Sequence, residues 1–181
     1  MQLTHKVPIA LAALLFAVAA VAEIATGRSR NPQDNDERAR RAALVTLDEA
    51  LARGDSVAAL RAWQQAAEAA RMNRGWSGLV EVGDARVRIE AATNGAVAAV
   101  PAARQVYLAA LSRARAERSV DGTVRVAEAF SALGDRDVAE QVLRTAASLA
   151  ARSRDNAAPL RVETARARLL EQSPAVTRVT F

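Results

Sequence analysis

The chain has 181 residues, a formal charge of +5, no cysteine and one histidine. The histidine is His5, so everything after the first apolar segment lacks both histidine and cysteine. These absences exclude thiol catalysis, Ser-His-Asp catalysis, histidine-bound haem and nearly all zinc and copper sites from that part. Paired carboxylates remain possible catalysts, but no pair stands out. We therefore expect a protein that is not an enzyme, with no catalytic residue, cofactor or metal.

Arginine supplies nearly all of the positive charge. The chain holds 25 lysines and arginines, of which only Lys6 is lysine. Together with abundant alanine, this composition is typical of a GC-rich bacterial coding bias. The arginines are spread among 20 acids without a basic stripe or interleaved aromatics, so we expect no nucleic-acid binding. Arginines near a membrane would still meet anionic lipid head groups, which is a subsidiary hypothesis.

Residues 7–25, VPIALAALLFAVAAVAEIA, form the only long apolar run. As a helix they would be roughly 28 Å long, close to the thickness of a bilayer's hydrocarbon core. Lys6, the apolar stretch and the small-x-small motif Ala20-Val21-Ala22 are also typical of a signal peptide. Residues 1–25 are thus a transmembrane anchor or a cleaved signal, and the anchor is our leading interpretation.

The residues after this run bear on its orientation. The flank contains five arginines: Arg28, Arg30, Arg38, Arg40 and Arg41. The positive-inside rule would keep them in the cytoplasm, because it gives little weight to the neighbouring acids. The signal-like leader favours export instead. We predict a single-pass protein of the bacterial inner membrane with a periplasmic domain.

The rest of the chain predicts an all-α domain over residues 37–172, built from antiparallel helix pairs. Residues 26–36 are polar and are predicted to form a linker, and residues 173–181 are predicted to form an extended tail. Pro101 is expected to start or kink the fourth helix. The turn Ser119–Gly122 is expected before the fifth. The predicted helices are 37–53, 56–72, 77–93, a fourth ending near 118, 123–133, 137–151 and 158–172.

Two segments share an internal spacing. Each has Gly-Asp at a turn, alanine five residues after the glycine, a bulky residue four later and another alanine three after that. The two sets are Gly54, Ala59, Trp63, Ala66 and Gly134, Ala139, Leu143, Ala146. A looser third set is Ala103, Tyr107 and Ala110. Glycine ends one helix without a Cβ penalty, and the alanines allow the next helix to approach closely.

At these residues the chain resembles the tetratricopeptide repeat family, over roughly residues 38–151. Gly134-Asp135, Ala139 and Ala146 fall on the family's second-helix positions, and Phe130 and Ala127 on its first-helix positions. The family's early tryptophan and its proline after the second helix are not in register, and a generic helical bundle is the alternative. The resemblance implies that a solenoid of about seven helices follows the predicted N-terminal membrane helix, and that the first helices of its pairs bind a protein.

That expected first-helix face lacks the basic and asparagine clamp by which some family members hold a C-terminal carboxylate. It presents Arg41, Leu44, Asp48 and Leu51, then Val124, Glu128 and Ser131. Trp76 is expected to be an exposed aromatic at a turn, and Phe181 to end an apolar tail that could add to a partner's surface. The candidate partner-binding residues are Trp76, Arg41, Leu44, Asp48, Glu128 and Phe181.

The function expected from these features is that of a membrane-anchored scaffold. It would be an accessory subunit that stabilises a respiratory, photosynthetic or envelope-assembly complex of a bacterium. Its partners would be the protein subunits of that complex, together with membrane lipid around the N-terminal helix. The alternative is a soluble periplasmic adaptor whose signal peptide is cleaved.

Overall fold

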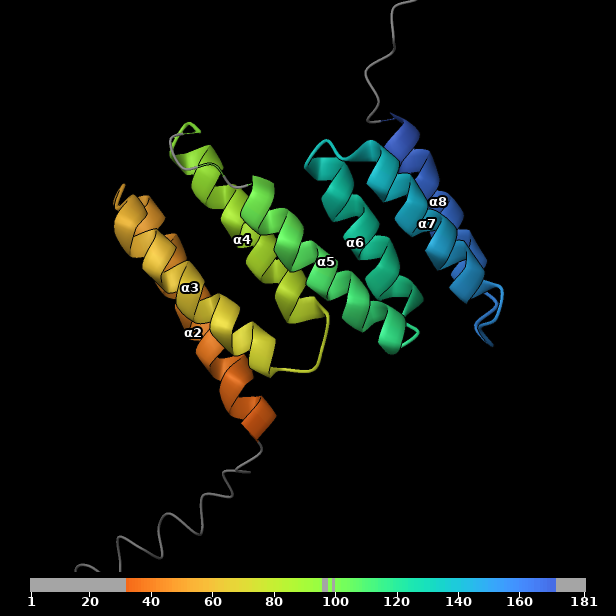
Figure 1. Ribbon diagram of the computed structural model, residues 1–181, viewed down its shortest axis with the longest axis horizontal. Helices are drawn as coiled ribbons and strands as arrows, with labels where there is room; N and C mark the ends of the chain where they lie inside the picture. The colour runs from red at the N-terminus through yellow and green to blue at the C-terminus, as the bar shows by residue number, and fades with distance from the viewer. Residues whose placement is uncertain (1–31, 96–97, 99, 172–181) are drawn as a thin grey trace, which may run out of the picture.

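The computed structural model describes residues 32–95, 98 and 100–171 of the chain. Within these residues it contains seven helices and no strand, which confirms the predicted all-α class. Figure 1 shows them standing side by side, with the chain running alternately up and down. The helices are α2 Pro32–Ala52, α3 Ser56–Met72, α4 Ser77–Ala92, α5 Val100–Ala116, α6 Val120–Ala132, α7 Arg136–Ala150 and α8 Ala158–Glu171.

The expected anchor, the first part of the linker (residues 26–31), the tail 173–181 and Phe181 all lie outside the described residues. Among the helices that are described, none is long and apolar enough to cross a bilayer. The anchor therefore stays a prediction.

Most helix boundaries agree with the predicted ranges. α3 has the predicted bounds, and α4, α7 and α8 differ by one residue at one or both ends. Pro101 is the second residue of α5, so it starts this helix and does not kink it. The first N–H groups of a helix have no intrahelical partner, so proline removes nothing there.

Two helices begin earlier than predicted. α2 starts at Pro32, so residues 32–36 of the expected linker are helical. Proline suits this position because its fixed φ matches the helix, and Asp34 in the first turn suits the helix dipole. α6 starts at Val120, so the turn predicted at Ser119–Gly122 is wrong. Ser119 caps α6 instead: its Oγ accepts a hydrogen bond from the N–H of Gly122 at 2.9 Å.

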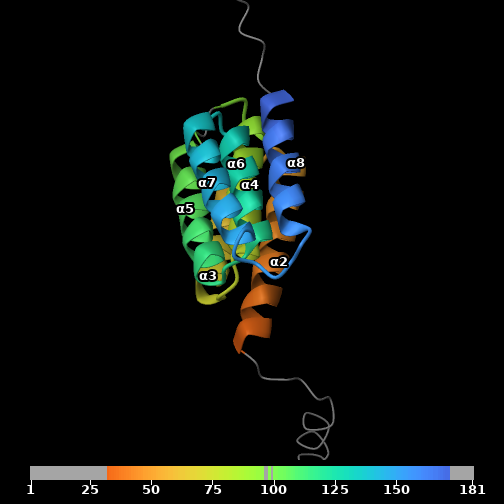
Figure 2. The ribbon, with the colours of Figure 1, turned by 90° about the vertical axis from the view of Figure 1, so that its right-hand side faces the viewer.

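The helices pack as a row of pairs. α2 packs on α3, α4 on α5 and α6 on α7. We call α2, α4, α6 and α8 the first helices, because neighbouring members of this set also pack on one another, and we call α3, α5 and α7 the second helices. α8 packs on both α6 and α7 and ends the row. Figure 2, turned by a right angle, shows the helix axes running along the same direction.

The core confirms the spacing read from the sequence. The alanines of all three sets are buried, with exposures of 2 % or less: Ala59, Ala66, Ala103, Ala110, Ala139 and Ala146. Tyr107 and Leu143 are also buried between them, while Trp63 is half-buried. Gly54, Gly95 and Gly134 end α2, α4 and α6 with φ of 73°, 79° and 83°. Glycine adopts this left-handed conformation without steric cost.

Candidate functional site

Arginine–carboxylate pairs join each first helix to the next across the surface. The two partners of every pair are 40 or 41 residues apart in the sequence. We call this set the ion-pair row. It consists of Arg40–Glu81 and Asp48–Arg88 between α2 and α4, Asp84–Arg125 between α4 and α6, and Asp121–Arg161 and Glu128–Arg168 between α6 and α8.

Asp84 lies at the centre of the row and has two partners. The Tyr107 hydroxyl of α5 donates to its Oδ1 at 2.7 Å, and Arg125 Nη2 of α6 donates to its Oδ2 at 2.5 Å. Burial and the hydrogen bond to Asp84 raise the pKa of Tyr107, so the phenol stays protonated. The Tyr107 ring also meets Phe130 of α6 edge-on, with centroids 5.8 Å apart. This group fixes α4, α5 and α6 relative to one another.

At the α2 end of the row, Arg40 is buried and pairs with two glutamates. Its guanidinium donates to Glu37 at 2.7 Å and also to Glu81 of α4. The hydrogen bond with Arg40 holds the pKa of Glu37 below its usual value. Gly78 makes room for this side chain, because a Cβ there would lie 2.9 Å from Arg40 Nε. A buried charge is tolerated only when it is paired in this way.

The exposed pairs have a different character. Asp48 and Arg88 are about half exposed and 2.9 Å apart. Arg168 lies 3.9 Å from Glu128, which is the loosest contact of the row. Exposed pairs of this kind contribute about 0–1 kcal/mol to stability. They therefore define the charge pattern of the surface more than they hold the fold together.

The structure places the predicted partner-binding residues in different settings. Asp48 and Glu128 belong to the ion-pair row. Arg41 is exposed beside the row and pairs with Glu37, while Leu44 is half-buried against the core. Trp76 is half-buried, so the prediction of an exposed aromatic is wrong.

The burial of Trp76 has a clear cause. Its indole lies on Gly122, where a Cβ would approach the ring to 2.7 Å. Because Gly122 in the first turn of α6 has no side chain, the Trp76 indole at the start of α4 can pack against it. The prediction treated this glycine as a turn residue, and so left the tryptophan without a neighbour.

Sequence reasoning named only Asp48 and Glu128 of the row. It missed the other eight members, which are Arg40, Glu81, Asp84, Arg88, Asp121, Arg125, Arg161 and Arg168. The signal was present, because opposite charges recur at a separation of 40 or 41 residues. The comparison from Gly-Asp to Gly-Asp aligned the second helices and ended before α8. Alignment of the first helices with one another would have brought these charges into register.

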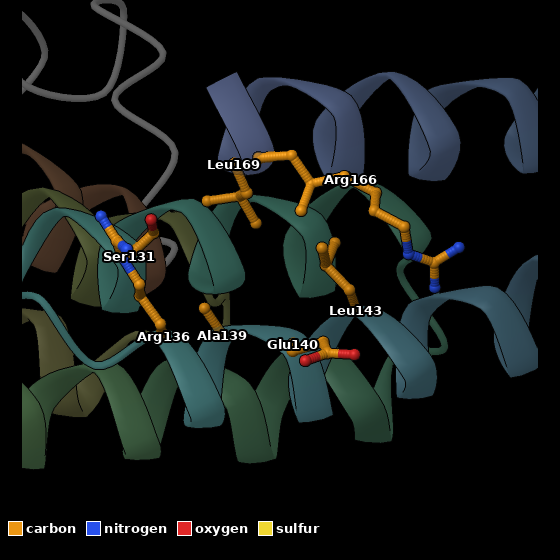
Figure 3. Close-up of a pocket in the computed structure, with 8 residues that line it drawn as sticks. Ser131, Arg136, Ala139, Glu140, Leu143, Arg166 and Leu169 are labelled. Atoms are coloured by element: carbon orange, nitrogen blue, oxygen red, sulfur yellow. The ribbon is translucent and has the colours of Figure 1, made fainter. Parts of the chain in front are cut away.

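Two hollows lie beside α8. One of about 410 Å³ opens between α6 and α8 and is lined by Asp121 and Arg161 of the row together with exposed Leu160. The second, of about 390 Å³, lies where α6, α7 and α8 meet. Figure 3 shows Leu143 and Leu169 directed toward it from facing helices. Both hollows are shallow surface features suited to the side chains of a partner.

The charged side chains of the row are engaged with one another. Within the described ranges, no group of three or more histidine, cysteine or acidic side chains could hold a metal ion. Each carboxylate of the row is paired with an arginine. Comparison with protein-family models, with curated proteins and with solved structures finds no match to this chain.

Proposed function

We propose that this protein is a non-catalytic scaffold, anchored in a bacterial inner membrane by residues 7–25, with its helical domain in the periplasm. It would stabilise a larger membrane complex, such as a respiratory, photosynthetic or envelope-assembly complex. The observation that carries the proposal is the row of first helices, each packed on the next. A row of this kind presents one continuous surface along which a partner protein can lie.

The finer part of the proposal is a tetratricopeptide-like solenoid. The packing of α2, α4, α6 and α8 supports it, as do the buried alanines of α3, α5 and α7. The ion pairs indicate a unit of 40 or 41 residues, longer than the family's usual length of about 34 residues. We propose a lengthened unit, with α8 as a further first helix after the three pairs.

The first-helix surface is the proposed partner-binding surface. It carries fixed charges of both signs, and on α6 these alternate along the helix from Asp121 through Arg125 to Glu128. Complementary charges on a partner would set its register and raise its rate of association more than its affinity. Leu160 beside the row offers an apolar contact.

Purification from the native membrane tests the scaffold. The full chain, carrying an affinity tag, is solubilised in mild detergent and separated on a native gel with its partners identified by mass spectrometry. We expect a stable assembly with defined membrane subunits. Migration as a free monomer would contradict the proposal.

A charge exchange tests the surface. The double variant Asp48→Arg/Arg88→Glu keeps the ion pair between α2 and α4 but reverses the charges that a partner would meet. The matched control Glu140→Arg/Arg144→Glu exchanges a pair within α7, where the two side chains are 3.3 Å apart. We expect the first variant to fold normally and lose its partner, and the control to keep it. Equal retention by both would place the binding surface elsewhere.

The alternative function is a soluble periplasmic adaptor with a cleaved signal. The intact mass of the protein from cells distinguishes the two, since cleavage after Ala22 would remove the anchor. Loss of residues 1–22 would establish the adaptor and rule out the anchored scaffold.

A further inference from the structure

Three of the segments that connect the helices, together with the start of α2, lie at one end of the row. The connections are α3–α4, α5–α6 and α7–α8, and Figure 1 shows them along the lower edge. Side chains join them directly. Arg113 near the end of α5 donates to the carbonyls of Ala70 and Arg71 at the end of α3, at 2.8 and 2.7 Å. Arg161 of α8 pairs with Asp121 in the first turn of α6 at 2.7 Å.

Five exposed arginines lie along this end, and we call them the arginine edge. None of the five takes part in an ion pair with the rest of the described chain. Two acids lie in the same three connections, Glu117 and Asp155, and Asp155 is already paired with Arg161. The start of α2 adds Asp34, Asp36 and Glu37, of which Glu37 is paired with Arg40 and Arg41. The arginine edge consists of Arg74, Arg115, Arg118, Arg152 and Arg154.

The opposite end of the row has a different charge balance. There, Arg53, Arg136 and Arg168 stand with the acids Asp55, Asp135, Asp137 and Glu171. The ordinary explanation for arginines at helix C-termini is the helix dipole. That explanation would put arginines at both ends, because α2, α4 and α6 end at the opposite one. Their three connections hold Arg53 as their one arginine, so the dipole does not account for the asymmetry.

The length of chain between the proposed anchor and α2 limits where this end can lie. Six residues, 26–31, separate Ala25 from Pro32. The path from Ala25 to Pro32 has seven residue steps, which at no more than about 3.6 Å each span at most about 25 Å. If residues 7–25 cross the membrane, the start of α2 lies within that distance of its surface. The arginine edge lies at the same end of the row as the start of α2, so this short tether allows it to face the lipid head groups.

We propose that the arginine edge binds anionic phospholipid head groups of the membrane that holds the anchor. This inference rests on the proposed function, because it places the edge through the anchor. A guanidinium binds phosphate oxygens with two parallel hydrogen bonds, and a negatively charged leaflet attracts basic residues within about a Debye length. Because the helix axes run from one end to the other, binding at this edge holds them upright on the membrane and turns the first-helix surface toward neighbouring subunits.

The test uses the full chain in vesicles of phosphatidylcholine alone or mixed with phosphatidylglycerol. The chain has no cysteine, so single labels are placed by Ala116→Cys at the arginine edge or Ala52→Cys at the opposite end, both exposed. Each carries a fluorophore, and the vesicles carry a quencher on their head groups. We expect strong quenching at position 116 that requires phosphatidylglycerol and weakens in high salt, and weak quenching at position 52.

A matched pair of variants assigns the effect to the edge. Arg152→Gln/Arg154→Gln removes two charges from it, and Arg53→Gln/Arg61→Gln removes two exposed charges far from it. Each basic residue near an anionic surface changes the ratio of edge bound to the vesicle surface to edge free of it about fivefold. The first variant therefore lowers this ratio roughly 25-fold. The second variant leaves it unchanged. Equal behaviour of both variants, or quenching at position 116 that ignores phosphatidylglycerol, would overturn the proposal.

Flotation separates failure of this inference from failure of the anchor. Flotation with neutral vesicles supports the anchor, and the quenching then decides on the edge. Flotation with phosphatidylglycerol vesicles alone would contradict the anchor while supporting lipid binding by the arginines. Flotation with neither kind of vesicle would contradict both proposals.

Discussion

Tyr107 connects three helices through a single side chain. Its ring fills the space above Gly83 of α4, its edge meets Phe130 of α6, and its hydroxyl reaches Asp84 on the first-helix surface. The sequence spacing placed Tyr107 at the bulky position of the third set. The hydrogen bond was not predictable from one helix, because Asp84 lies 23 residues away and is brought near by the pairing of α4 with α5.

Gly83→Ala tests this packing. A Cβ at position 83 would lie 2.2 Å from the Tyr107 ring, so either the ring or α4 must shift. Overpacking of a core costs typically about 1–3 kcal/mol, which outweighs the gain of up to about 1 kcal/mol in helix propensity. We expect the free energy of unfolding in urea to fall by about 1–2 kcal/mol. In the control Gly75→Ala, the new Cβ meets nothing closer than 3.6 Å and a change below about 0.5 kcal/mol is expected. Equal changes would contradict the packing.

At the scale of elements, periodicity and turn glycines predicted where the helices lie. They did not predict how α2 and α6 begin. Both misjudged segments contain helix-breaking residues, Pro32 and Gly122, in first turns where such residues are tolerated. In α6 the capping serine and the contact with Trp76 stabilise the start. The capping serine could be recognised in the sequence. The contact with Trp76 could not, because it depends on how α4 packs against α6.

Ser119→Ala tests the start of α6. The serine Oγ accepts a hydrogen bond from the N–H of Gly122, and its loss leaves that donor without its partner. Removal of a capping serine costs about 1 kcal/mol, typically within a range of about 0.5–2 kcal/mol. Chemical denaturation should show this loss. The control Ser112→Ala changes an exposed serine inside α5, where alanine is the better helix former, and no loss is expected. A loss as large in the control would show that the cap is not its cause.

At the scale of the whole molecule, the ion-pair row and the helix contacts recur along one direction. The class of fold was predictable, since each pair of helices has its own glycine turn and its own alanines. The candidate surface was only partly predictable. Asp48 and Glu128 were named, but their arginine partners come from the next first helix. Which helices become neighbours is decided by packing between pairs, and that packing leaves no mark within a single helix.

A linear row of helices and a globular bundle respond differently to a destabilising substitution at one end. α8 contacts α6 and α7 but neither α2 nor α3, and its Val162 is 1 % exposed. In a row, stability is close to a sum of terms between neighbours, so weakening α8 should act on that end. Val162→Ala should therefore raise amide hydrogen exchange in α8 by roughly 30-fold, for a local cost of about 2 kcal/mol. Exchange in α2 and α3 should stay the same. Leu160→Ala removes a side chain that is 70 % exposed and should change neither. If Val162→Ala instead raised exchange equally in α2 and α8, the helices would unfold as one unit and the solenoid proposal would be wrong.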